Sequence, residues 1–220
     1  MLATVVGTLS HEFGHYSVAK YLGYSSTIGY DHTHWDDSKN QPFIDSVFLK
    51  HPDELEVNHD FPKKSKFQEI QNKKMQDAFW ITLAGPIQTI STGTVGFLLL
   101  LTQRKKIKKA KTIKIYQWFY IFLSLFWLRQ LANVFLWTIG YFINGNLSEN
   151  GDEVKLAIFL NLPKESIIVS TAIVALQVLS FVIFKIIPAD KRITFISAGF
   201  FGGIFGYLSW LVWFGPIIMP

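Results

Sequence analysis

The residues with the clearest chemical meaning are His11, Glu12 and His15, which form a His-Glu-x-x-His pattern. Residues four positions apart lie on one face of a helix, so both imidazoles can reach the same metal ion. Glu12 follows the first histidine directly, where its carboxylate can take a proton from water at the metal. The pattern therefore predicts a catalytic metal site of the kind found in metal-dependent hydrolases.

This pattern lies within an apolar segment, residues 2–24, which is interrupted only by Glu12, the two histidines and Lys20. At 1.5 Å per residue, the segment spans roughly 34 Å as a helix, which matches the hydrocarbon thickness of a bilayer. Ionisable groups at that depth are costly and usually face a cavity or a partner. We therefore expect the site to lie inside a membrane helix. The segment lacks a basic start, which argues against a cleavable signal peptide.

The composition is that of an integral membrane protein, because 50% of the residues are hydrophobic and 16% are aromatic. Four further apolar runs follow the first segment, at residues 79–101, 115–143, 167–187 and 193–218. The sequence thus predicts an all-α polytopic membrane protein with about five transmembrane helices, forming a single domain over residues 1–220. Cysteine is absent, so a metal must be held by His, Asp, Glu or water.

A polar stretch, residues 25–78, separates the first two expected spans and contains ten acidic and seven basic residues. Residues 26–30 and 43–49 have β-like composition, and residues 67–78 have helical composition. We expect a small loop on the membrane surface that contains a strand or hairpin. Its edge is a candidate for pairing with an extended substrate, and a simple ordered loop is the alternative.

Positive charge is concentrated in the loop at residues 103–114, which has seven basic residues and no acidic one. A short basic loop between two spans indicates the cytoplasmic side, with anionic lipid headgroups as its natural contact. Nucleic-acid binding is not expected. The chain is then a multi-pass protein of the cell membrane, with residues 25–78 and 144–166 on the opposite side.

Two motifs in this order resemble the site-2 protease family of intramembrane zinc metalloproteases, in its short form without a regulatory domain. The residues at positions 11–15 are similar to the His-Glu-hydrophobic-Gly-His of its first core helix, and Leu83-Ala84-Gly85-Pro86 resembles the Ala-Gly-Pro of the next. The family takes a later aspartate as its third zinc ligand. Residues 146–152 are the nearest counterpart, although Gly151 precedes Asp152 where the family pattern places glycine after the aspartate.

The resemblance implies an intramembrane zinc endopeptidase that cleaves a transmembrane or membrane-adjacent segment of another protein. One Zn²⁺ would be held by His11, His15 and Asp152, with Glu12 as the general base. Asn133 would hold the substrate or the oxyanion, and an interhelical hydrogen bond is the alternative role. Other candidates for the third ligand are Glu149, Glu153 and Asp31.

Other interpretations of the charged residues remain. Arg129 is costly within an apolar helix, so we expect it to pair with a carboxylate or to reach the interface. Residues 31–37 contain two histidines and three aspartates, which form either a second cation site or a solvated loop. The whole chain has a second interpretation as a non-catalytic, metal-containing membrane protein that binds transmembrane partners. The sequence does not indicate the number of subunits.

Overall fold

The computed structural model describes residues 2–57, 59–109 and 112–219, and its regular structure is helical apart from one two-stranded sheet. The first half contains α1 (Leu2–Tyr21), β1 (Ser25–Ile28), β2 (Thr33–Asp36), α2 (Gln41–Lys50), α3 (Pro52–Glu56) and α4 (Lys64–Lys109). The second half contains α5 (Ile115–Ser124), η1 (Leu125–Trp127), α6 (Leu128–Asn144), α7 (Asp152–Phe159), α8 (Glu165–Phe181), η2 (Val182–Ile186), η3 (Ala189–Lys191), α9 (Arg192–Tyr207), η4 (Leu208–Phe214) and α10 (Gly215–Ile218).

Four helical stretches among the described residues are long and apolar enough to cross a membrane: Lys64–Lys108, Ile115–Asn144, Glu165–Ile186 and Ala189–Ile218. They correspond to the second to fifth spans that the sequence predicts, of which residues 167–187 end one residue beyond the helical stretch. The all-α polytopic fold with a small β-containing region is therefore confirmed. The expected number of about five differs from four because of α1, which is as long as a span but carries several polar side chains.

The ionisable side chains at the centre of α1 lie on the face that points into the protein. Its buried positions are Thr8, His11, Glu12, His15 and Ala19, which share one helix face. Leu2, Val6 and Phe13 are exposed on other faces. The mean hydropathy of the whole segment therefore does not reveal its apolar outer surface. This distribution suits a helix with lipid on its outer face and polar groups on its inner face.

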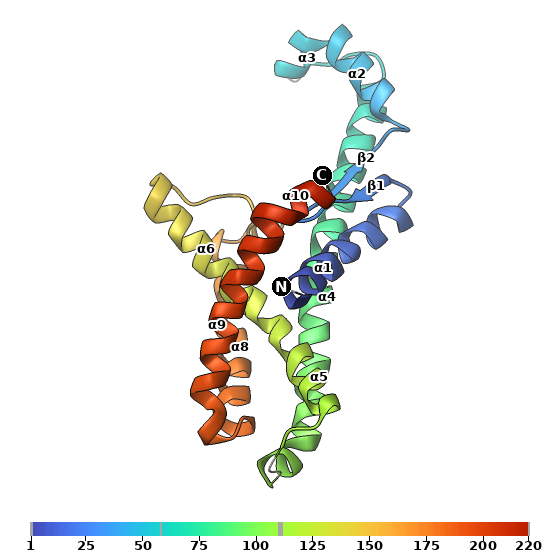
Figure 1. Ribbon diagram of the computed structural model, residues 1–220. Helices are drawn as coiled ribbons and strands as arrows, with labels where there is room; N and C mark the ends of the chain where they lie inside the picture. Colours follow the sequence, from blue (N-terminus) through green and yellow to red (C-terminus); the bar gives the residue numbers. More distant parts are fainter. Residues whose placement is uncertain (1, 58, 110–111, 220) are drawn as a thin grey trace.

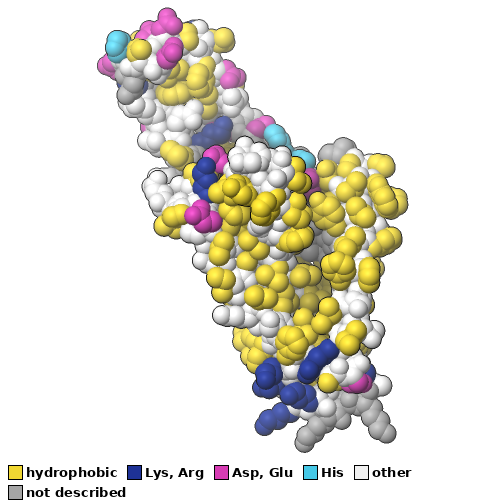
Figure 2. Space-filling model, turned by 90° about the vertical axis from the view of Figure 1, so that its left-hand side faces the viewer, with side chains coloured by type: hydrophobic (Ala, Val, Ile, Leu, Met, Phe, Trp, Pro, Cys, Tyr) yellow, Lys and Arg dark blue, Asp and Glu magenta, His cyan; other side chains and the backbone are white. Residues whose placement is uncertain are grey.

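Helix α4 is the longest element among the described residues and is longer than the hydrocarbon core of a bilayer is thick. Its 46 residues correspond to about 69 Å, against about 30 Å of hydrocarbon. The extension before Phe79 confirms the helix expected at residues 67–78. At the opposite end, Lys and Arg side chains gather at the lower edge of the face in Figure 2, below a surface rich in hydrophobic side chains.

The polar segment between α1 and α4 forms a hairpin and a small helical cap. Strands β1 and β2 pair antiparallel, with Ser25 opposite Asp36, which confirms a hairpin beginning in the expected region. The β-like assignment of residues 43–49 was wrong, because they lie in α2. Ile44 and Val47 are three residues apart and bury the same face of α2 against Phe61 and Phe67. Packing at helical spacing overrides the local β propensity.

The membrane helices form two groups, with α1 and α4 on one side and α6, α8 and α9 on the other (Figure 1). Helix α1 packs along α4, and α6 packs against α8. The short helix α7 bridges the groups, because it contacts both α4 and α8. Helix α7 begins at Asp152, and its packing brings this residue to the face of α4 that α1 covers.

Candidate metal site

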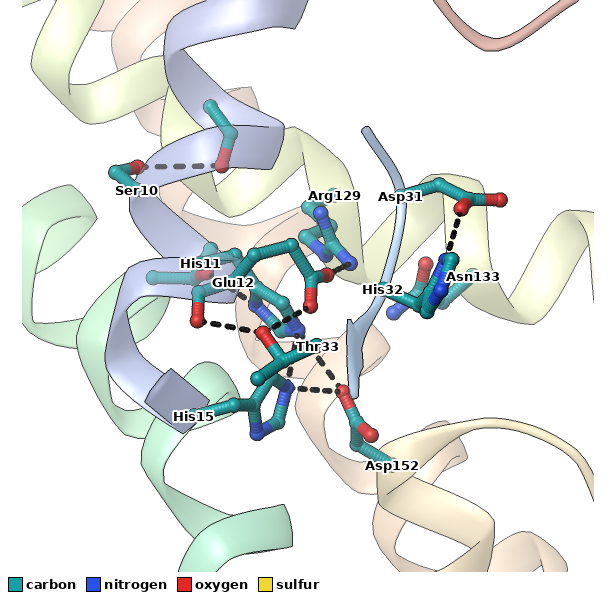
Figure 3. A network of polar contacts seen from close by, with 12 residues as sticks. Ser10, His11, Glu12, His15, Asp31, His32, Thr33, Arg129, Asn133 and Asp152 are labelled. Atoms are coloured by element: carbon teal, nitrogen blue, oxygen red, sulfur yellow. Dashed lines mark hydrogen bonds and ion pairs between the residues drawn. The ribbon is translucent and has the colours of Figure 1, made fainter. Parts of the chain in front are cut away.

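Three ligand-type atoms converge between α1 and α7 (Figure 3). Asp152 Oδ2 lies 2.9 Å from His11 Nε2 and 3.2 Å from His15 Nε2. The two Nε2 atoms are 3.1 Å apart. In a tetrahedral zinc site with bonds of about 2.0–2.1 Å, neighbouring ligand atoms are about 3.3 Å apart. The triangle formed by these atoms therefore has nearly the dimensions that one metal ion requires.

The other imidazole nitrogens are held by partners that fix the rings. His15 Nδ1 lies 2.6 Å from the carbonyl oxygen of Ile81, which only accepts hydrogen bonds, so Nδ1–H is the donor. The neutral ring then carries its lone pair on Nε2, facing the cluster. His11 Nδ1 lies 2.9 Å from the Thr89 hydroxyl. Both rings thus present Nε2 to Asp152, in the orientation that ligation requires.

Two glycines allow α1 and α4 to cross closely enough for these contacts. A Cβ atom at Gly14 would lie 2.8 Å from the carbonyl oxygen of Ala84. A Cβ atom at Gly85 would lie 2.6 Å from His11 Nε2 and still closer to the His15 ring. The Gly14 and Gly85 positions in the two sequence motifs therefore have a physical role, because a side chain at either would occupy space that the site needs.

Asp152 is positioned by the turn that precedes α7. Gly151 has φ of 122°, which strongly favours glycine, and this explains why glycine comes before the aspartate in this chain. The indole of Trp137 donates a hydrogen bond to the carbonyl of Ser148 and ties the loop to α6. Burial acts to raise the pKa of Asp152, but hydrogen bonds with His11 and His15 hold this pKa below its usual range.

Glu12 is buried beside this triangle and is held by two other elements. The Thr33 hydroxyl lies 3.1 Å from Glu12 Oε2 and 2.9 Å from the Glu12 carbonyl oxygen. Arg129 Nη2 lies 4.0 Å from Glu12 Oε1, which confirms that Arg129 faces a carboxylate. A Glu12 oxygen also lies close enough to the imidazoles to be a ligand atom, within 4.8 Å. Glu12 and Asp152 are thus the two carboxylates that could share a metal with the histidines.

Asn133 contacts Glu153 rather than the histidines. Its Nδ2 lies 3.1 Å and 3.3 Å from the two carboxylate oxygens of Glu153, which is 2% exposed. This contact links α6 to α7 one residue after Asp152. For Asn133, the sequence predicted either a role in holding the substrate or oxyanion or an interhelical hydrogen bond, and this contact is such a hydrogen bond.

We expect Asn133→Ala to lower the free energy of unfolding by about 2 kcal/mol, because it leaves the buried Glu153 carboxylate without its amide donor. Denaturant titration of the purified protein in detergent measures the change. Asn144→Ala, at an exposed position on the same helix, should change this free energy by less than about 0.5 kcal/mol. A double variant with Glu153→Ala should lose less than the sum of the single losses. Strict additivity would show that the contact contributes nothing.

The remaining candidate acids lie apart from the triangle. Glu149 is exposed and pairs with Lys164, and Asp31 pairs with His32 at the surface. Within the described ranges, no group of His and acidic side chains close enough to hold a metal is found at residues 31–37; the group that is found contains His11, Glu12 and His15. Part of that segment is β2, whose Thr33 instead contacts Glu12.

A cavity of about 580 Å³ opens beside the cluster, and carboxylates, two histidines and an arginine lie on its wall. Its lining comes from α1, the hairpin, α4, α6, α7 and α8, and includes Glu12, His15, Thr33, Arg129, Asn133 and Asp152. This volume is within the range of pockets that bind small ligands or a few residues of peptide. A molecule in the cavity can therefore reach both Glu12 and the candidate ligands.

Two contacts at the site were missed by sequence reasoning. Thr33 carries no motif, and its contact with Glu12 depends on how the hairpin folds back over α1. Thr89 had a detectable signal, because it follows Gly85 by four residues and so shares its helix face. Comparisons with known proteins add no assignment, since no family model, curated protein or solved structure matches the chain significantly.

Proposed function

We propose that this protein is a membrane-embedded zinc endopeptidase of the site-2 protease type, which hydrolyses a peptide bond within or next to a transmembrane segment of another protein. The observation that carries the proposal is the convergence of His11 Nε2, His15 Nε2 and Asp152 Oδ2 within 3.2 Å of one another, with Glu12 beside them. Two imidazoles and one carboxylate are a ligand set of catalytic zinc sites, which keep a fourth position open.

Asp152 is the better third ligand, because both Nε2 atoms already face its Oδ2. Glu12 instead accepts a hydrogen bond from Thr33 and faces Arg129. It is then not needed as a metal ligand and can act as a base. When bound by these residues, zinc would polarise a peptide carbonyl and lower the pKa of a water molecule to about 7.

The chain's own residues account for the proton transfers of peptide hydrolysis. Water oxygen adds to the carbonyl carbon, and Glu12 takes the proton that this water loses. The C–N bond then breaks, and Glu12 passes the proton to the leaving amine. The Thr33 hydroxyl keeps the carboxylate turned toward the cavity. A substrate helix must unwind locally before its carbonyl can enter, because helical hydrogen bonds otherwise shield it.

The proposed orientation puts the basic end of α4 in the cytoplasm, following the positive-inside rule. Arg104 follows Gly85 by 19 residues, which is about 28 Å along the helix. That distance is close to the full hydrocarbon thickness. The site then lies near the non-cytoplasmic edge of the membrane, where we expect cleavage of the substrate.

The proposal is tested by cleavage in membranes, in a format that does not require the substrate to be identified first. Vesicles containing this protein and the membrane proteins of a bacterial host should accumulate new amino termini inside or beside transmembrane segments. Their yield should fall at least about tenfold after treatment with 1,10-phenanthroline and recover when zinc is restored. Mass spectrometry of labelled termini measures this. Unchanged termini after chelation, or zinc-loaded protein that produces none, would contradict the proposal.

A further inference from the structure

Arg129 is a charged side chain whose position the proposed proton transfers do not explain. It is residue 15 of the 30 in the span Ile115–Asn144, and so lies at the midpoint of an apolar helix. A charge within an apolar helix is costly unless it has a partner or a task. Its guanidinium lines the cavity that also contains Glu12 and Asp152.

The contacts of Arg129 use little of its hydrogen-bonding capacity. Within the described residues, its ion pair is with Glu12 Oε1 at 4.0 Å, beyond hydrogen-bond distance. Its Nε atom is buried without a hydrogen-bond partner among these residues. A guanidinium has five N–H donors, and buried donors without partners are rare in folded proteins. Arg129 therefore has donors available beside the proposed catalytic base.

The backbone of α6 is arranged to bring this guanidinium to the cavity. The 3₁₀ turn η1 ends two residues before Arg129 and packs on α4. A Cβ atom at Gly93 of α4 would lie 2.7 Å from Trp127 Cδ1, so this glycine permits the close approach. In the same helix, the Asn133 amide is already directed to Glu153. Arg129 is therefore a charged donor of α6 that lines the cavity and is free to contact a substrate.

We propose that Arg129 is a catalytic residue that donates hydrogen bonds to the carbonyl oxygen of the scissile peptide bond. This inference rests on the proposed function. When water adds to the carbonyl carbon, the π electrons of the carbonyl move to this oxygen, which becomes negatively charged. A fixed guanidinium stabilises that charge more than it stabilises the neutral carbonyl, and the charge is discharged when the C–N bond breaks. Arg129 thus contributes chiefly to kcat.

The test compares two inhibitors that use the same metal. A phosphinic tripeptide with leucine side chains has two oxygens on a tetrahedral phosphorus and mimics the tetrahedral, charged intermediate, whereas acetohydroxamate binds the metal through a planar group without a tetrahedral centre. Arg129→Gln should weaken binding of the phosphinic tripeptide by about 100-fold and that of acetohydroxamate by less than about threefold. Zinc content should stay at one per chain. Arg104→Gln, far along α4, is the matched control and should bind both probes like the original protein.

Kinetics on a peptide cleaved in the vesicle assay provide a second measurement. Arg129→Gln should lower kcat by about 100-fold with little change in KM, and guanidinium chloride should partly restore kcat in Arg129→Ala. Equal weakening of both inhibitors, or loss of zinc in Arg129→Gln, would make Arg129 a structural counter-ion of Glu12 and overturn the inference. If Glu12→Gln stops cleavage but Arg129→Gln does not, the proposed function stands without this inference. If zinc-loaded original protein binds neither inhibitor, both proposals fail.

Discussion

Glu12→Gln is expected to lower the rate of peptide cleavage by about 10³-fold or more while leaving one zinc per chain. Glutamine has nearly the same shape as glutamate and can still accept a hydrogen bond from the Thr33 hydroxyl, 3.1 Å from Glu12 Oε2. Its amide does not accept a proton near neutral pH, so the base is lost without a change in packing. The rate on a peptide from the vesicle assay and the zinc content by mass spectrometry are the two measurements.

The zinc content of this variant also decides between the two carboxylates of the site. Asp152 Oδ2 is within 3.2 Å of both Nε2 atoms, so Asp152→Asn should release zinc whereas Glu12→Gln retains it. Loss of zinc from Glu12→Gln would instead make Glu12 a ligand. Glu149→Gln is the matched control, because this acid lies near Asp152 in sequence but pairs with Lys164 at the surface. If cleavage is unchanged in Glu12→Gln, it does not come from this site, which would favour a non-catalytic, metal-containing protein.

The local part of the site could be predicted because it follows from helix geometry. His11 and His15 are four residues apart, and a single helical turn brings both imidazoles to one face. The apolar runs likewise indicated most of the membrane helices, because about 20 apolar residues are needed to cross a bilayer. The pairing of His11 with Asp152 spans 141 residues, and it was predicted only through a family resemblance. Spacing alone contains no information about that contact.

The errors in the polar segment have a local cause. Residues 43–49 are rich in β-branched and aromatic side chains, which favours a strand by propensity. Asn40 as the N-cap and Pro42 at the start of α2 were the helix signals that this reasoning passed over. Burial of Ile44 and Val47 then stabilises the helical form. Propensity was the weaker signal because packing against Phe61 and Phe67 selects the helical spacing.

The contacts that orient Glu12 were beyond sequence reasoning for a different reason. Thr33 reaches it from a hairpin and Arg129 from another membrane helix, so both contacts depend on how separate elements pack. Many other polar residues in the chain have a similar local sequence, so the local sequence does not indicate which of them contact Glu12. Asn133 and Arg129 illustrate the difficulty, because the two lie one turn apart on α6 and yet face different carboxylates, Glu153 and Glu12.

Gly85→Ala is expected to weaken zinc binding by about 100-fold while the chain keeps its fold. The added Cβ atom would lie 2.6 Å from His11 Nε2 and still closer to the His15 ring. These atoms are the ends of side chains, so the rings can turn away without moving the helices. They lose their hydrogen bonds to Ile81 and Thr89, but alanine favours the helix more than glycine does, which offsets part of this cost. Turning moves both Nε2 atoms out of reach of Asp152. Competition with a fluorescent zinc chelator measures the affinity.

Gly93→Ala is the control that separates loss of zinc affinity from a general disturbance of helix packing. Its Cβ atom would lie 2.7 Å from Trp127 Cδ1, so it also meets a side chain across a close contact of α4, but away from the triangle. We expect a lower unfolding temperature and a zinc affinity within about threefold of the original protein. Gly85→Ala should show the opposite pattern, with little loss in unfolding temperature. Zinc binding by Gly85→Ala as tight as that of the original protein would place the ion elsewhere, because the imidazoles cannot hold it there while a methyl group occupies the same space.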